Sequence, residues 1–115
     1  MIWLLVILLG WATVSSGMAE IRDGKGFEFF EKHIRPVLVD RCYKCHSAQA
    51  KKLKGGLRLD TREGLRKGGA SGDAIQPGNA AESLLIQALR HAADAPGMPP
   101  DAPLPGNVVN AFVAW

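Results

Sequence analysis

The sequence predicts an all-α fold, and three observations support this prediction. Apolar residues recur at helical spacing in several separated segments, whereas no segment alternates apolar and polar residues for long enough to form a sheet. Glycines and prolines gather between the helical segments, where such residues end helices and form turns. With 115 residues and no internal repeat, the chain has room for one domain with a modest core.

The first 19 residues predict an export signal. Residues 2–14 form an uncharged, mostly apolar run, which has the length of a signal-peptide core and is too short to span a bilayer comfortably. Small residues at 17–19 place the cleavage after Ala19. No Lys or Arg precedes the apolar run, so an uncleaved anchor is the alternative interpretation. In both cases we expect residues 20–115 to be the exported domain.

The first helix is predicted over residues 24–40. Its apolar residues fall at i, i+3, i+7, i+10 and i+11, which draws one stripe: Phe27, Phe30, Ile34, Val37 and Leu38. Pro36 removes a backbone donor within this pattern, so we expect a kink or a broken turn near Arg35. The helix should end at or just before Cys42.

Residues 55–78 contain seven glycines and are predicted to be mostly loop and turn. Within them, residues 60–63 (Asp-Thr-Arg-Glu) have the spacing of a capping box, with Asp60 as the cap, and Gly68 would end the short helix begun there. The apolar residues that this segment offers to an interior are Leu57, Leu59 and Leu65.

Two further helices are predicted in the C-terminal part. Residues 79–82 (Asn-Ala-Ala-Glu) again resemble a capping box, and the helix that follows lines one face with Leu84, Leu85, Ala88 and Leu89. Residues 92–106 carry five prolines and cannot form a regular helix. The last helix is predicted from Asn107, with Val108, Ala111, Phe112 and Trp115 on one face. Because the pattern stops at Trp115 without a cap, we expect the domain to be truncated within this helix.

Residues 41–46, RCYKCH, hold both cysteines of the chain. A disulfide oxidoreductase also uses Cys-x-x-Cys, but at a helix N-terminus, whereas this motif follows a predicted helix. A structural zinc site needs four ligands, and the three histidines of this chain, His33, His46 and His91, are scattered singly. Neither interpretation accounts for the histidine that directly follows Cys45.

Cys-x-x-Cys-His is the attachment motif of covalent haem c. The two thiols, Cys42 and Cys45, would add to the haem vinyl groups, and His46 would be the proximal iron ligand. Attachment of haem c takes place outside the cytoplasm, in agreement with the predicted export signal. We therefore expect one haem c.

The sixth iron ligand is less constrained by the sequence. Met98 lies in "PGMPP", where the flanking prolines stiffen the backbone, and its thioether would raise the reduction potential. His91 is an alternative ligand, although a cation near a helix C-terminus needs no other reason. His33 fits better as a surface residue of the first helix.

Beyond this motif, residues 27–115 resemble the planctomycete-type cytochrome c domain. The matching stretches are "IRPVLVDRCYKCHS", "KGGLRLDTREGLRKGG", "IQPGNAAESLLIQALRH" and "MPP". The resemblance implies a haem c on Cys42 and Cys45 with His46 proximal and Met98 distal. It also implies an exported setting and a place at the front of a larger multidomain protein. In "DAPLPGNVVNAFVAW", Pro105-Gly106-Asn107 replaces the family's polar cap, so a late start or looser packing of the last helix is expected.

The sequence thus predicts a small cytochrome c fold of three to four short helices around one covalent haem. The expected function is one-electron transfer without catalysis, in a periplasmic or cell-envelope location. The alternatives are a haem-based sensor or weak peroxidase with an open sixth site, and a disulfide-stapled interaction module without haem.

The net charge of +3 excludes nucleic acid as the main partner because no long basic block is present. Lys44, Lys51, Lys52 and Lys54 cluster around and after the cysteine motif. They form either a solvated loop or a positive rim that attracts an acidic redox partner. We expect a redox partner protein or downstream domains of a longer chain as partners, and a membrane only if residues 1–19 remain as an anchor.

Overall fold

The computed structural model describes residues 24–115. The predicted export signal, its cleavage after Ala19 and the anchor alternative lie outside these residues. Within them the regular structure is helical, and an isolated bridge between Gly69 and Gly72 is the one β feature. The predicted all-α class is confirmed. In this same part of the chain, no helix combines the length and the apolar character that a membrane crossing requires.

The predicted first helix is present but is interrupted by a π-helical turn. Residues 24–29 are helical, the π turn η1 follows at Phe30–Ile34, and α2 spans Arg35–Arg41. In the wide turn the Arg35 N–H bonds to the Phe30 carbonyl, five residues back. Pro36 lies in the first turn of α2, where its missing N–H is not needed. The expected disruption near Arg35 is therefore confirmed, in the form of a π turn.

Two shorter helical elements follow, η2 (Lys54–Gly56) and α3 (Arg62–Lys67). The cap of α3 is Thr61, whose Oγ1 accepts a hydrogen bond from the Gly64 N–H at 3.0 Å. The prediction of Asp60 as the cap was wrong, because the Asp60 carboxylate is engaged by Arg58 and by the Ala48 N–H instead. Gly68 ends the helix with a φ of 71°, as predicted.

The helix α4 (Leu84–Leu89) is shorter than the sequence suggested. The Asn79 side chain accepts from the Glu82 N–H at 3.2 Å, so the predicted capping interaction forms, but it closes a turn that precedes the helix. Ser83 is the actual first flanking residue, and its buried hydroxyl accepts from the Gln76 N–H and donates to the Asn79 carbonyl. Through these two hydrogen bonds, Ser83 joins the preceding loop to the start of α4.

The last helix, α5 (Gly106–Ala114), begins one residue before the predicted Asn107, so a late start was wrong. Its buried face also differs from the prediction. Val109 and Phe112 are buried, whereas Trp115 is 40% exposed. The helix packs against both α4 and η1, and the rings of Trp115 and Phe30 lie 5.3 Å apart between centroids.

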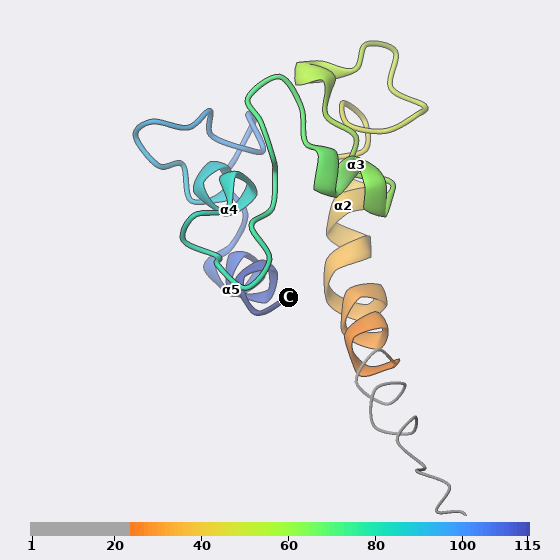
Figure 1. Cartoon of the computed structure of the whole chain (residues 1–115), viewed down its shortest axis with the longest axis vertical. Coiled ribbons are helices and arrows are strands. Elements are labelled where there is room, and N and C mark those ends of the chain that lie inside the picture. The colour runs from red at the N-terminus through yellow and green to blue at the C-terminus, as the bar shows by residue number, and fades with distance from the viewer. Residues whose placement is uncertain (1–23) are drawn as a thin grey trace, which may run out of the picture.

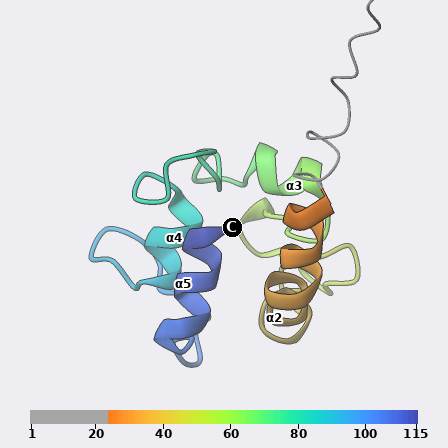
Figure 2. The ribbon, with the colours of Figure 1, turned by 90° about the horizontal axis from the view of Figure 1, so that it is seen from below.

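The helices are arranged as two groups, with α4 and α5 on one side and α2 and α3 on the other (Figures 1 and 2). Both groups supply the core, in which Ile34 and Leu38 are fully buried, together with Leu59, Leu65, Ile86, Leu89, Leu104, Val109 and Phe112. Ile34 and Leu38 are four residues apart and share one face, which anchors the C-terminal end of α2. The core therefore holds the segment from which the cysteine motif emerges.

Candidate functional site

The cysteine motif forms a tight turn at the C-terminal end of α2. The Cys42 and Tyr43 N–H groups both bond to the Leu38 carbonyl, at 3.0 and 2.9 Å. The Cys45 and His46 N–H groups then bond to the Cys42 carbonyl, at 3.2 and 3.0 Å. One turn of chain therefore carries both thiols and the imidazole. Both cysteines are free and half-buried.

The imidazole of His46 is buried and held by one ring nitrogen. Its Nδ1 lies 3.1 Å from the Leu57 carbonyl oxygen, so Nδ1 carries the proton and donates it. The backbone supports this arrangement, since the Leu59 N–H bonds to the His46 carbonyl at 2.9 Å. Among residues 24–115 no group hydrogen-bonds to Nε2. The geometry therefore leaves the Nε2 lone pair available, oriented by a backbone carbonyl as metal-bound histidines commonly are.

A cavity of about 340 Å³ adjoins the motif and is lined mainly by apolar side chains. Its wall comes from the motif itself, from residues 54–59 and 69–74, from α4, and from residues 96–100. Cys42, Cys45, His46 and Met98 all belong to this lining, although Met98 lies 52 residues beyond His46 in the chain. The volume is within the range of cofactor sites. Segments distant in sequence thus converge on a single apolar chamber.

The other two histidines are placed differently. His91 and His33 are exposed, and neither lines the cavity. The His33 ring lies 4.8 Å from that of Phe29 on the first helix. Of the candidate sixth ligands from the sequence, the structure brings Met98 alone into the chamber that holds His46.

The segment carrying Met98 is tied to the start of the cysteine motif. The Arg41 Nη2 donates to the Ala102 carbonyl at 3.1 Å and lies 3.3 Å from the Asp101 carboxylate. Leu104, just beyond, is buried in the core. Since Arg41 directly precedes Cys42, these contacts connect the cysteine motif to the segment that carries Met98, and both line the cavity.

A family comparison supports the same conclusion as the geometry. The family described as Planctomycete cytochrome C matches residues 42–102, which is more than half of the chain. The chain belongs to this cytochrome c family. No curated protein and no solved structure matches the chain.

The lining of this cytochrome domain fits a haem c group chemically. Two thiols lie on one turn, an imidazole is held by its Nδ1 while its Nε2 has no hydrogen bond within residues 24–115, and a thioether shares the same apolar cavity. Within residues 24–115 no group of three or more His, Cys, Asp or Glu side chains is arranged to hold a metal ion. A structural zinc site needs four such ligands.

The electrostatics of Cys42 also argue against thiol redox chemistry. Burial raises the pKa of the Cys42 thiol to about 11, and the neighbouring Arg41 charge offsets this only in part. A catalytic redox thiol needs a lowered pKa, since the thiolate is the nucleophile. The pKa of the Cys42 thiol is therefore shifted in the opposite direction from that of a catalytic thiol in an oxidoreductase.

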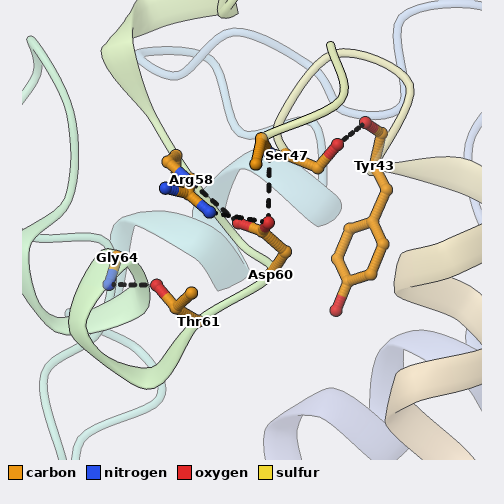
Figure 3. A network of polar contacts seen from close by, with 7 residues as sticks. Tyr43, Ser47, Arg58, Asp60, Thr61 and Gly64 are labelled. Carbon is orange, nitrogen blue, oxygen red and sulfur yellow. Dashed lines mark hydrogen bonds and ion pairs between the residues drawn. The ribbon is translucent and has the colours of Figure 1, made fainter.

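A polar network behind the motif was not found from the sequence. The Asp60 carboxylate accepts from the Arg58 guanidinium at 2.8 and 3.0 Å and from the Ala48 N–H at 3.0 Å (Figure 3). The Ser47 hydroxyl donates to the Tyr43 carbonyl at 2.6 Å. The Ala48 bond fastens the chain just after His46 to Asp60, and the Ser47 bond spans the turn that contains Cys45 and His46. The sequence analysis did single out Asp60, but it assigned this carboxylate to the start of the following helix and not to Arg58 and Ala48.

Gly69 lies in the cavity wall, at a position where a larger residue would not fit. A Cβ at this position would collide with the Gly55 carbonyl oxygen and lie 3.1 Å from the Leu57 Cβ. The Ala70 N–H bonds to that same Gly55 carbonyl at 2.8 Å, which brings the two loops together. The absence of a side chain at Gly69 therefore leaves room for Leu57, whose carbonyl accepts the hydrogen bond from His46.

Proposed function

We propose that this domain is a one-electron carrier that uses a single, covalently bound haem c. The observation that carries the proposal is one apolar cavity whose lining includes Cys42, Cys45, His46 and Met98. Haem is large and mostly apolar, so a chamber of this composition favours its burial. Membership of the cytochrome c family supports the same function.

Cys42 and Cys45 are proposed as the attachment residues. Each S–H would add across one haem vinyl double bond, forming one C–S and one C–H bond with no leaving group. His46 would supply the proximal ligand through Nε2, while its Nδ1–H stays bonded to the Leu57 carbonyl. That bond fixes the tautomer and the ring plane, so little rearrangement is needed when a metal binds.

Met98 is proposed as the distal ligand. A thioether donor favours ferrous iron and raises the reduction potential. Residue 98 would also occupy the position at which oxygen or peroxide binds, which favours a carrier over a sensor or peroxidase. The apolar residues that share the cavity with Met98 would limit the access of water to a bound haem and so reduce the solvent rearrangement that accompanies a change of iron charge.

The first test is the mass of the exported protein. The chain would be produced in a host that attaches haem to other c-type cytochromes, then denatured and weighed by mass spectrometry. The expected mass is the polypeptide plus one haem, and Cys42→Ala/Cys45→Ala should show the polypeptide alone. A wild-type mass lacking haem would reject the proposal, and a further loss of two hydrogens would support the disulfide-stapled module.

The same sample tests the proposed location. We propose that the domain acts outside the cytoplasm, in the periplasm or cell envelope, because attachment of haem c takes place there. N-terminal sequencing should read Glu20. A start at Met1 with membrane association would instead support the anchor interpretation.

The surface around the motif suggests an acidic redox partner, either a separate protein or a domain of a longer chain. Residues 41–58 hold six of the 14 Lys and Arg and none of the 11 Asp and Glu, so the rest of the chain is net negative. Arg41 and Arg58 are paired with carboxylates, whereas Lys44, Lys51, Lys52 and Lys54 are exposed. The Lys54 backbone N–H bonds to the Cys45 carbonyl at 3.1 Å, and Lys54 lines the cavity, so this residue lies beside the proposed attachment site.

The electrostatic part of this proposal can be measured with inorganic reagents. Reduction by the anionic ferrocyanide complex should slow as salt rises, whereas reduction by the cationic hexaammineruthenium complex should accelerate. Lys51→Gln/Lys52→Gln/Lys54→Gln should remove most of this contrast, and Lys25→Gln/Lys32→Gln on the first helix should preserve it. Equal salt responses in the wild type and the triple variant would reject the positive docking surface.

A further inference from the structure

The C-terminal end of α4 contains an unusual backbone conformation at His91. Its φ is +51°, and no other non-glycine residue within 24–115 has a positive φ. The His91 N–H bonds to the Ala88 carbonyl, and the Ala92 N–H bonds to the Gln87 carbonyl, at 3.1 and 3.0 Å. This is the Schellman pattern, and His91 occupies the position that glycine normally takes. A side chain at this position is disfavoured, so its presence calls for a reason.

The His91 imidazole lies against the backbone of Gly97. A Cβ built on Gly97 would come within 2.6 Å of the ring Cε1 and 2.8 Å of the ring Cγ, closer than real Cβ contacts. The φ of Gly97 is not in the positive range, so its backbone does not require glycine. A larger residue here would have to displace the imidazole that covers Gly97.

One carbonyl joins this cap to the proposed distal ligand. The Ala88 oxygen accepts from the His91 N–H at 3.1 Å and from the Met98 N–H at 2.9 Å. Ala88 itself lines the cavity. Between the two donors, residues 92–94 are exposed, and the loop has one internal backbone bond, from the Ala95 N–H to the Ala92 carbonyl. The Met98 backbone is therefore held at α4 chiefly by the Ala88 carbonyl and by the ring over Gly97.

We propose that His91 is a positioning residue that holds the Met98 thioether at the cavity wall and thereby strengthens its coordination. This inference rests on the proposed function. The ring acts by steric contact with Gly97, which limits the loop to conformations in which the Met98 N–H reaches Ala88. A preorganised loop binds iron with less loss of conformational entropy than a free one, so a competing ligand has more difficulty displacing Met98.

The test compares folding stability with the strength of Met98 coordination in the haem-loaded protein. His91→Gly should keep or raise the thermal midpoint, because glycine is favoured at this helix end. The same change should raise the affinity of added imidazole for ferric iron by about tenfold, since fewer molecules hold Met98 in place. His91→Asn, which tolerates the conformation but has no ring, should behave in the same way. Arg90→Ala should alter neither measurement.

A double-mutant cycle isolates the contact between the ring and Gly97. Gly97→Ala should displace the imidazole and raise the imidazole affinity on its own. In the His91→Gly background there is no ring to displace, so Gly97→Ala should add little. Additive effects of the two changes would overturn the steric coupling.

Met98→Ala is the reference that separates failure of this inference from failure of the proposed function. If Met98→Ala opens the iron to imidazole and His91→Gly does not, the positioning role is rejected while the carrier proposal stands. If His91→Gly removes the native ligation and Met98→Ala has no effect, His91 is the ligand and both proposals are overturned. A parallel fall in thermal midpoint and coordination in His91→Gly would indicate a merely structural role and would also overturn the inference.

Discussion

The two sides of the cavity wall are built in different ways. On the side of His46, residues 42–60 are joined by closely spaced backbone bonds, and the imidazole is fixed by the Leu57 carbonyl. On the side of Met98, residues 92–104 form a proline-containing loop attached by a few distant contacts, from Ala88 at one end and Arg41 at the other. The His46 side is therefore determined by local chain geometry, and the Met98 side by tertiary packing. The His46 side should tolerate less change than the Met98 side.

The largest predicted contrast lies between the two proposed iron ligands. His46→Ala should greatly reduce the yield of haem-loaded protein, because the covalent motif loses its axial anchor. Met98→Ala should leave haem attached, lower the reduction potential and allow carbon monoxide to bind the ferrous form. Absorption spectra and redox titration of the purified variants measure both effects. Equal yields of holoprotein from the two variants would contradict the difference between the two sides.

The next prediction compares buried leucines on the two sides, Leu59 and Leu104. Each is almost fully buried, so Leu59→Ala and Leu104→Ala should both destabilise the fold by about 2–5 kcal/mol in denaturant unfolding. Leu59 lines the cavity next to His46, whereas Leu104 supports the loop that carries Met98. Leu104→Ala should therefore weaken Met98 coordination more than Leu59→Ala does. Val39→Ala, at an exposed position, serves as the control.

A smaller effect is expected from Asp60 at low pH. Its pKa is lowered from 3.8 to about 2, chiefly by the hydrogen bonds from Arg58 and then by that from the Ala48 N–H. A lowered carboxyl pKa stabilises the fold above pH 3.8, and this contribution is lost as the pH falls from 3.8 toward 2. Because Arg58 is partly exposed, we expect a contribution of up to about 1 kcal/mol.

Asp60→Asn should flatten the stability profile in this acid window, as measured by chemical unfolding at a series of pH values. Asp94→Asn, at an exposed carboxylate outside the network, should leave the slope in place. An unchanged slope in Asp60→Asn would show that the carboxylate does not stabilise the His46 side.

The smallest effect is predicted for the link between the two sides. Arg41→Gln should change the folding stability little, because the Asp101 carboxylate of this ion pair is largely solvent-exposed. It should nevertheless broaden the distribution of Met98 conformations, visible as a slight weakening of the sulfur–iron absorption band. Arg35→Gln removes a comparable exposed pair with Glu31 and should not affect the band. Identical bands in all three proteins would show that Arg41 does not restrain the loop.

What the sequence predicted follows the same division between local and tertiary control. The helical periodicity before Cys42, the cap at Gly68 and the non-helical proline segment depend on neighbouring residues, and all three are present. The role of Asp60 was mistaken because its partners Arg58 and Ala48 compete with the helix end, which Thr61 caps instead. A capping pattern does not encode that competition.

The tertiary features were accessible only from the structure. The buried face of α5 shifted to Val109 because α4 and η1 both pack on this helix, and the sequence does not show from which directions they approach. Likewise, "PGMPP" indicates a stiff loop, but its place in the cavity wall depends on the Ala88 carbonyl and on Arg41. The motif itself predicted the roles of Cys42, Cys45 and His46, whereas the residues alone left both Met98 and His91 as candidate sixth ligands, and the cavity lining includes Met98 but not His91.

The π turn at Phe30–Ile34 has a consequence for how this chain tolerates changes in length. A π turn contains one residue more than an α turn, so it stores an extra residue within the helix. A one-residue deletion among residues 31–33 could be absorbed by conversion to a regular turn, leaving Ile34, Leu38 and Cys42 in register. The same deletion within α2 would rotate the preceding core residues by roughly 100° relative to the motif. Natural insertions and deletions before the cysteines should therefore concentrate in this turn.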